Sequence, residues 1–148
     1  MVEIRSANVA DARALEQIQR QALAESSPQL LEKALDGVLG LRVGVTAEVP
    51  ATEVVLGYAL FLEGRATARL LELAVRPNRQ REGIGSSLLV NLCERLATAE
   101  HEELRVTARC TDHRARDFYT SHGFRTRERL PEYFEEADGV LLVRKLSD

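Results

Sequence analysis

The spacing of hydrophobic and polar residues changes several times along the first forty residues. Val2–Arg5 alternates as a short strand does. A helix-start signal at Asn8 precedes apolar residues at helical spacing to about Glu25. The pair Ser27-Pro28 is a second start signal, with proline at the first helical position, and this helical pattern continues to Gly40. The sequence therefore predicts one strand followed by two helices.

The remainder of the chain is predicted to form strands interrupted by two further helices. Pro50 and the pair Glu63-Gly64 mark turns, so the first three of these strands are expected to form an antiparallel meander. The expected strands are Leu41–Val49, Val54–Glu63, Ala66–Arg76, Leu104–Cys110, Phe124–Leu130 and Val140–Leu146, and the expected helices are Gly83–Ala99 and Asp112–Gly123. The order β, α, α, β, β, β, α, β, α, β, β predicts an α/β (α+β) fold with a mixed, mostly antiparallel sheet flanked by helices.

Composition agrees with one globular domain spanning residues 1–148. The chain is 45% hydrophobic and 29% charged, with a formal net charge of -3. No repeat or Pro/Gly-rich linker divides it. The longest apolar stretch, Val54–Leu62, is far shorter than the ~20 residues that span a bilayer, and the N-terminus lacks an apolar segment. A cytoplasmic protein without a membrane partner is expected.

The positions of the cysteines and the net charge argue against a metal site and a nucleic-acid partner. Cys93 and Cys110 have no CxxC spacing, and the histidines do not stand at zinc-site intervals from them, so no metal site is expected. The net negative charge disfavours a nucleic-acid partner, although it leaves room for a local basic patch.

The segment Arg76–Ser86 carries the first candidate site, between a strand and a helix. Unpaired N–H groups at a helix start favour an anion such as a diphosphate, and Gly83 and Gly85 would allow close approach. Arg79 and Arg81 add positive charge. An ordinary surface loop remains the alternative. The segment lacks the Gly-Lys-Ser/Thr of a P-loop, and a leucine stands where a dinucleotide fingerprint has its third glycine, so NAD is not expected.

Two motifs together resemble the GNAT superfamily of acetyl-CoA-dependent N-acetyltransferases. The first is Leu73–Pro77 leading into Gln80–Gly85, which has the Q/R-x-x-G-x-G/A pattern. The second is Asp112-x-x-Ala115-x-x-Phe118-Tyr119-x-x-x-Gly123-Phe124. The resemblance covers nearly the whole chain. The tail Leu130–Phe134, followed by Asp138–Val143, is similar to the peptide-gripping loop and last strand of N-terminal acetyltransferases that modify a ribosomal protein.

The resemblance implies a binding site for acetyl-CoA. Backbone amides from about Arg81 to Ser86 would bind the coenzyme diphosphate. The strand Leu73–Val75 would pair with the pantetheine arm, and an amide near Leu73 would stabilise the oxyanion. The coenzyme-binding residues implied in this way are Leu73, Ala74, Val75, Gln80, Arg81, Glu82, Gly83, Ile84, Gly85, Ser86, Asp112 and Tyr119. Asp112 departs from the usual asparagine, and an aspartate can cap a helix but cannot donate an amide hydrogen bond.

Tyr119 occupies the family's general-acid position. A phenol with a pKa near 10 stays protonated at neutral pH and can donate to a thiolate whose conjugate acid has a pKa of about 8.5. The alternative is a helix aromatic packed on the core.

The general base does not transfer from the family pattern. Counting back from Asp112 to the base position reaches Thr107, whose hydroxyl cannot act as a base near pH 7. Glu72, on the central strand, is the substitute candidate, with an ion-paired strand carboxylate as its alternative. Glu132 and Tyr133 are candidates for the acceptor pocket, or else part of an exposed charged loop.

The missing base favours a weakly basic acceptor. A free α-amine, with a pKa of about 8, is roughly a tenth neutral at pH 7, whereas a lysine amine, with a pKa of about 10.4, is neutral in less than about a thousandth; the difference is about 3 kcal/mol. The sequence therefore predicts acetyl transfer to a primary amine, preferably a protein or peptide N-terminal α-amine, by direct attack in a ternary complex. A small-molecule amine acceptor and a catalytically idle acyl-CoA-binding module remain alternatives.

Overall fold

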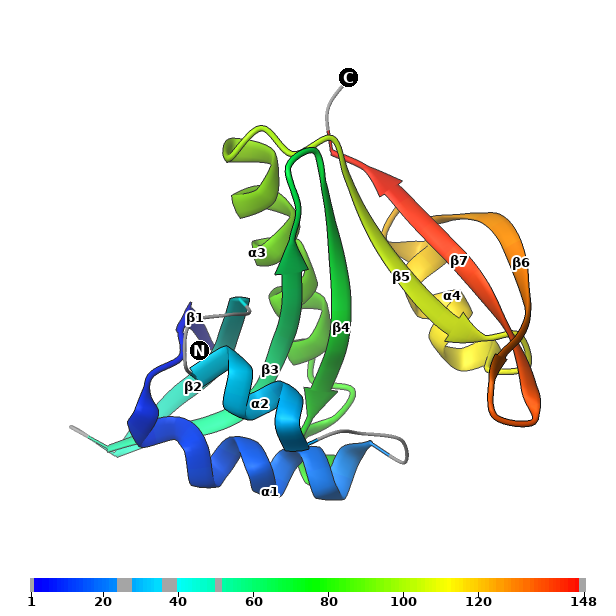
Figure 1. Cartoon of the computed structure of the whole chain (residues 1–148). Helices are drawn as coiled ribbons and strands as arrows, with labels where there is room; N and C mark the ends of the chain where they lie inside the picture. The colour runs from blue at the N-terminus through cyan, green and yellow to red at the C-terminus, as the bar shows by residue number, and fades with distance from the viewer. Residues whose placement is uncertain (1, 24–27, 36–39, 50–51, 147–148) are drawn as a thin grey trace. The chain divides into compact units, whose positions relative to one another are not determined.

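The computed structural model of the chain describes residues 2–23, 28–35, 40–49 and 52–146 (Figure 1). The strands are β1 (Glu3–Ser6), β2 (Gly40–Val49), β3 (Thr52–Glu63), β4 (Thr67–Val75), β5 (Glu103–Arg109), β6 (Arg125–Phe134) and β7 (Ala137–Lys145). The helices are α1 (Ala12–Ala22), α2 (Pro28–Leu35), α3 (Ile84–Thr98) and α4 (His113–Ser121), with short 3-10 helices at Val9–Asp11 and Pro77–Arg79. The predicted order of helices and strands is confirmed.

The boundaries differ from the prediction mainly at one strand. Residues 131–134, expected in a loop, belong to β6, which continues to Phe134. The hairpin explains the extension, because Leu130 pairs with Gly139 and Phe134 pairs with Ala137 across a register shift. Pro131 is tolerated there because β6 is an edge strand and needs no N–H on its open side. The predicted helix-start residue Ser27 and the turn at Pro50 lie outside the described residues.

The described residues group into two compact units. The first comprises residues 1–63 and 70–92, and the second comprises residues 64–69 and 93–148, so β4 and α3 contribute to both. Strands β1, β2 and β3 of the first unit pair antiparallel in sequence order. In the second unit, β7 lies between β5 and β6 and pairs antiparallel with both.

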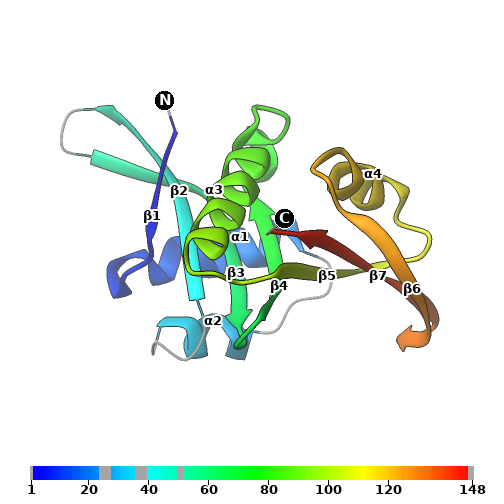
Figure 2. The same ribbon diagram turned by 90° about the horizontal axis from the view of Figure 1, so that it is seen from above.

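The core of the first unit lies between its strands and the first two helices. Leu15 and Ile18 of α1 and Leu31 of α2 are fully buried, or nearly so, against Tyr58 and Leu60 of β3. Helix α3 lies on the opposite side of β3 from α2 (Figure 2). This arrangement surrounds β3 with apolar surface on both faces, and a polar side chain on it therefore needs a hydrogen-bond partner.

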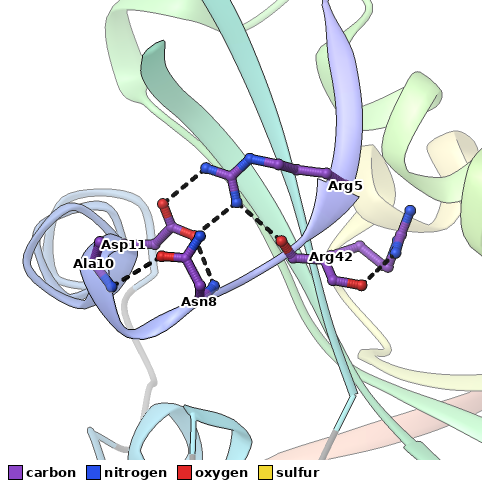
Figure 3. A network of polar contacts seen from close by, with 6 residues as sticks. Arg5, Asn8, Ala10, Asp11 and Arg42 are labelled. Atoms are coloured by element: carbon purple, nitrogen blue, oxygen red, sulfur yellow. Dashed lines mark hydrogen bonds and ion pairs between the residues drawn. The ribbon is translucent and has the colours of Figure 1, made fainter. Parts of the chain in front are cut away.

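The helix start predicted at Asn8 is confirmed as a capping box (Figure 3). The Asn8 side chain accepts a hydrogen bond from the Ala10 backbone, while the Asp11 carboxylate accepts one from the Asn8 backbone at 2.9 Å. Both Asp11 oxygens also accept hydrogen bonds from the Arg5 guanidinium at 2.9 Å. This bidentate pair fixes β1 to the start of the first helical segment.

In the second unit, α4 lies on one face of the β5, β7 and β6 strands (Figures 1 and 2). The Asp112 side chain accepts a hydrogen bond from the Ala115 backbone at 3.0 Å, so the predicted cap of α4 is confirmed. Gly123 follows this helix with a φ of 86°, a left-handed conformation that favours glycine and ends the helix. No helix among the described residues is long and apolar enough to cross a membrane.

Candidate active site

A buried carboxylate lies at the centre of the first unit. Glu72 of β4 is only 7% exposed, because alternate residues of this strand point into the core. Its Oε1 atom accepts a hydrogen bond from the Tyr58 hydroxyl at 2.9 Å and another from the Gln19 side-chain amide at 2.9 Å. Tyr58 is fully buried, and Gln19 is nearly so. Three elements, α1, β3 and β4, therefore position one carboxylate oxygen.

Both partners of Glu72 are neutral donors. Burial, and then the neighbouring Glu72 charge, raise the pKa of Tyr58 well above its usual range. The phenol therefore stays protonated and donates to the carboxylate. Hydrogen bonds of this kind compensate in part for the removal of a charged carboxylate from water.

A glycine allows β3 to approach β4 close to this cluster. A Cβ at Gly57 would lie 2.6 Å from the Ala74 carbonyl oxygen and 3.2 Å from Val75 Cα. Beyond Val75, the Arg76 backbone N–H donates to the Leu56 carbonyl at 2.8 Å, and the Arg76 guanidinium donates to the Val55 carbonyl. The end of β4, where coenzyme contacts are predicted, is thus fixed by backbone contacts with β3.

The predicted diphosphate segment forms a turn that leads into α3. Arg81 and Gly83 have positive φ values of 67° and 82°. Among the described residues other than its two chain neighbours, none has an atom within 4 Å of the position that a Cβ would take at Gly83. The first backbone hydrogen bond of α3 runs from Ser87 N–H to the Gly83 carbonyl at 2.9 Å, so the preceding N–H groups have no acceptor within the helix.

Two side chains of this turn are already engaged. The Arg79 guanidinium forms an ion pair with Glu82 at 3.0 Å, so the positive charge predicted to face an anion is partly neutralised. The Gln80 side-chain amide donates to the Val75 carbonyl at 3.2 Å and joins the turn to the end of β4. The backbone, rather than these side chains, is the part of the turn suited to bind a diphosphate.

The second unit contains the candidate acid. Tyr119 lies on α4 and is 9% exposed. Its ring packs edge-on against Phe118 and Phe124, with centroid distances of 5.3 and 5.4 Å. Burial, and then the charge of Asp112, raise the pKa of Tyr119 above its usual range. The two interpretations of Tyr119, a core aromatic and a general acid, are therefore compatible. The ring packs in the core, and the hydroxyl stays protonated.

The second unit also contains Thr107, at the family's base position, and the acceptor candidates Glu132 and Tyr133. The Thr107 hydroxyl on β5 is buried and, within the described part of the chain, has no hydrogen-bond partner. Glu132 adopts a φ of 53°, and its N–H donates to Asp138 at 2.9 Å. Tyr133 is half exposed. A pocket of about 700 Å³ at this hairpin is lined by Glu132 but not by Tyr133.

The candidate residues are thus divided between the two units. The first holds Glu72, Leu73–Val75 and Gln80–Ser86, and the second holds Asp112, Tyr119, Glu132 and Tyr133. Sequence reasoning missed Gln19 and Tyr58 as partners of Glu72. A signal for Gln19 was present, because it stands one helical turn after Leu15 on the apolar face of α1. Nothing in the local sequence of β3 distinguishes Tyr58 from an ordinary core aromatic.

Comparison with known proteins establishes the family. The family profile described as "Acetyltransferase (GNAT) domain" matches residues 42–126, more than half of the chain. This chain belongs to the GNAT family of acetyltransferases. An uncharacterized N-acetyltransferase of Methanocaldococcus jannaschii is 30% identical to this GNAT chain over 151 residues, covering 96% of the chain and 90% of the relative. The predicted GNAT resemblance and acetyl-CoA-dependent acyltransferase class are thereby confirmed.

Solved structures support the GNAT fold. The ribosomal-protein-S18-alanine N-acetyltransferase from Escherichia coli matches with a TM-score of 0.87 at 22% identity, covering 100% of this chain and 96% of that one. NAA60 of Arabidopsis thaliana, in complex with acetyl-CoA, matches with a TM-score of 0.86 at 16% identity, covering 98% of both chains. At these identities, the likeness concerns the fold and leaves the acceptor to be argued from the site.

Proposed function

We propose that this GNAT enzyme transfers the acetyl group of acetyl-CoA to the α-amine of a protein or peptide N-terminus, by direct attack of the amine in a ternary complex. The observation that carries the proposal is the Glu72 carboxylate, buried on β4 and held by Tyr58 and Gln19. Glu72 immediately precedes Leu73–Val75, the segment proposed to bind the pantetheine arm. The proposal treats residues 1–148 as one acetyltransferase domain.

The turn before α3 has the properties that a coenzyme diphosphate requires. Its positive φ values at Arg81 and Gly83 and its open space at Gly83 suit close approach of phosphate oxygens to backbone N–H groups. In the proposal, Arg81–Ser86 hold the diphosphate through their backbone, and Gln80 holds the turn against Val75. Acetyl-CoA, when bound, supplies an acetyl group activated as a thioester.

In the proposal, one residue of the chain accepts a proton from the amine and another donates a proton to the leaving group. Glu72 accepts the proton that the attacking amine loses, directly or through a water molecule. The Tyr119 hydroxyl donates a hydrogen bond and then a proton toward the departing sulfur, and the Leu73 backbone N–H donates to the carbonyl oxygen as it gains negative charge. Because burial raises the pKa of Tyr119, the hydroxyl is present as a donor throughout the neutral range.

The choice of acceptor rests on the residue at the family's base position. Thr107 stands where an acid or histidine is expected, and its buried hydroxyl cannot take a proton near neutral pH. An α-amine is more readily deprotonated than lysine. The name of the similar E. coli enzyme, an alanine N-acetyltransferase, also supports an α-amine. Glu132 and Tyr133 of the β6–β7 hairpin are the residues proposed to contact the peptide.

Release of free thiol from acetyl-CoA, measured with paired acceptors, tests the proposal. One set of peptides presents a free α-amine and no lysine, and the matched set has a blocked N-terminus and one lysine. We expect turnover with the first set to exceed that with the second at neutral pH. Equal or faster lysine acetylation would overturn the α-amine assignment, and acetyl-CoA binding without thiol release from any acceptor would identify an idle module.

The variant Glu72→Gln tests the base with little change in shape, because the amide oxygen can still accept from Tyr58 and Gln19. We expect kcat/KM to fall and its rise toward alkaline pH to flatten. Glu94→Gln is the matched control, since Glu94 is exposed on α3. An unchanged pH profile in Glu72→Gln would remove this carboxylate from the mechanism.

A further inference from the structure

The second unit contains a basic pocket that the proposed acetyl transfer does not use. It has a volume of about 540 Å³ and lies where β6 begins and β7 ends. Its lining residues are Gly123, Arg125, Thr126, Arg127, Val143, Arg144 and Lys145. Four of the seven carry a positive charge and none carries a negative one, although the whole chain has a formal net charge of -3. The local basic patch left open by the sequence is found here.

One carboxylate beside the pocket neutralises only part of this charge. Glu103 of β5 accepts hydrogen bonds from Arg127 at 3.0 Å and from Arg105 at 2.6 Å. Burial acts to raise the pKa of Glu103, but the hydrogen bonds from these two guanidinium groups outweigh it and lower the pKa. Glu103 is therefore ionised and shared between two arginines, so that Arg127 remains only partly compensated.

Arg144 faces a neutral group. Its guanidinium interacts with the thiol of Cys93, and burial raises the pKa of this thiol despite the opposing effect of Arg144. The thiol therefore stays protonated and supplies no negative charge. Gly123 also lies close to this side chain, since a Cβ added there would be 3.7 Å from Arg144 Nε. Packing thus holds Arg144 in place without neutralising it.

The other two cations are also exposed. Arg125 and Lys145 are exposed at the start of β6 and the end of β7. Within the part of the chain that the structure describes, no ion pair or side-chain hydrogen bond joins either of them to an acid. The acid opposite Lys145 in the β5–β7 pairing is Glu103, which Arg105 and Arg127 already engage. Strand pairing fixes their spacing, because Arg125 lies opposite Val143, two residues before Lys145 on β7.

We propose that this pocket binds a phosphate group of a nucleotide-sized ligand or of an RNA chain. Guanidinium groups bind phosphate oxygens through paired, charge-assisted hydrogen bonds, and several converging cations compensate a dianion. The volume lies within the range of about 300–1,000 Å³ typical of small-ligand sites. The pocket shares no residue with Leu73–Val75 or Gln80–Ser86, the proposed coenzyme contacts.

Titration calorimetry with inorganic pyrophosphate, on the full chain saturated with coenzyme A, tests the site. The double variant Arg125→Glu/Lys145→Glu is compared with Arg65→Glu/Arg95→Glu, which makes the same change in charge at exposed residues outside the pocket. We expect the first variant to weaken pyrophosphate binding at least about tenfold, since two charge-assisted contacts are lost, and the second to bind as the unchanged protein does. Equal binding by both variants, equal loss in both, or no binding by the unchanged protein would overturn the proposal.

Two further measurements separate the source of the phosphate and the role of the site. A short RNA oligonucleotide that competes with pyrophosphate, with an affinity that falls as salt rises, would assign the site to a nucleic-acid chain. Failure of RNA to compete would assign it to a small phosphorylated molecule. The KM for acetyl-CoA should be unchanged in Arg125→Glu/Lys145→Glu. A higher KM would show that the pocket belongs to the coenzyme site and would overturn its independence, whereas loss of the proposed acetyl transfer would leave the pyrophosphate result unaffected.

Discussion

At the scale of single residues, the chain places a carboxylate in a hydrophobic core and provides it with two donors. An unpaired carboxylate in such a position would be strongly destabilising, because burial removes its hydration. Tyr58 and Gln19 donate to the same Glu72 oxygen, which fixes the orientation of the whole group. The two hydrogen bonds therefore stabilise the folded chain and, in the proposed mechanism, orient the Glu72 carboxylate as a base.

Replacing Tyr58 by phenylalanine removes one of these donors and leaves the ring in place. We expect the free energy of unfolding to fall by about 1–3 kcal/mol, since a buried acceptor loses a partner, and kcat/KM to fall with it. Urea unfolding and thiol-release assays measure the two effects. Tyr133→Phe, at a half-exposed position, is the control for stability. A variant as stable as the original protein would contradict a structural role for this hydrogen bond.

Replacing Tyr119 by phenylalanine tests the acid without disturbing its aromatic contacts. We expect kcat to fall by roughly 10² or more, the usual effect of removing a positioned acid, with little change in melting temperature. Because the pKa of Tyr119 is raised, the unchanged enzyme should show no loss of activity from phenol ionisation below about pH 10. An alkaline decrease that begins near pH 8 and disappears in Tyr119→Phe would contradict this environment.

At the scale of secondary-structure elements, two devices determine how strands and helices meet. One is the close approach of β3 and β4 at Gly57, which brings Tyr58 and Glu72 within hydrogen-bonding distance. The other is the capping box with its Arg5–Asp11 ion pair, which links β1 to the first helical segment. The first depends on Gly57 and the second on Asp11, and replacing either residue is expected to affect how a whole element packs.

The variant Gly57→Ala should be destabilised by about 1–3 kcal/mol through overpacking, because the new Cβ would lie 2.6 Å from the Ala74 carbonyl oxygen. Gly83→Ala provides the contrast. Apart from its chain neighbours, no described residue has an atom within 4 Å of its Cβ position, so its cost of about 1–2 kcal/mol comes from the positive φ alone. Thermal unfolding measures both. The variants should also differ in how they affect activity. Gly57→Ala alters the environment of Glu72, whereas Gly83→Ala fills the space proposed for phosphate oxygens and should raise the KM for acetyl-CoA.

The Arg5–Asp11 pair makes stability depend on pH. Hydrogen bonds from Arg5 outweigh the opposing effect of burial and lower the pKa of Asp11 below its ordinary value. The stabilisation is therefore present above about pH 4 and is lost as the pH falls through the lowered pKa. We expect Asp11→Asn to lower stability by about 1 kcal/mol at pH 7 and to match the original protein in acid. Asp117→Asn, on the exposed side of α4, should show no such dependence.

At the scale of the whole molecule, binding of acetyl-CoA is expected to raise the stability of the folded chain. A ligand that binds only the folded chain stabilises it by about 2.7 kcal/mol at a hundred times its Kd. For a chain of this length, acetyl-CoA should then raise the Tm by about 5–10 °C, measured by differential scanning calorimetry. Adenosine, which lacks the diphosphate, serves as the control. The absence of a shift with saturating acetyl-CoA would contradict the coenzyme contacts proposed for Arg81–Ser86.

Local sequence was sufficient to predict the structural features that depend on residues close together in the chain. The order of helices and strands, the capping residues Asn8 and Asp112, and the turn around Gly83 all follow from periodicity and short-range backbone preferences. The GNAT resemblance was likewise contained in two contiguous motifs, and the family match confirms it. The extension of β6 to Phe134 was not predictable in this way, because it depends on pairing across the hairpin with β7.

Only the tertiary structure revealed which distant side chains share a hydrogen bond. Gln19 and Tyr58 are 53 and 14 positions from Glu72, and nothing along the chain couples them to it. The basic pocket likewise combines Arg125 with Lys145 through the pairing of β6 and β7. Periodicity encodes which face of an element is apolar, whereas a site requires the relative placement of several elements, and that is set by packing over long sequence separations.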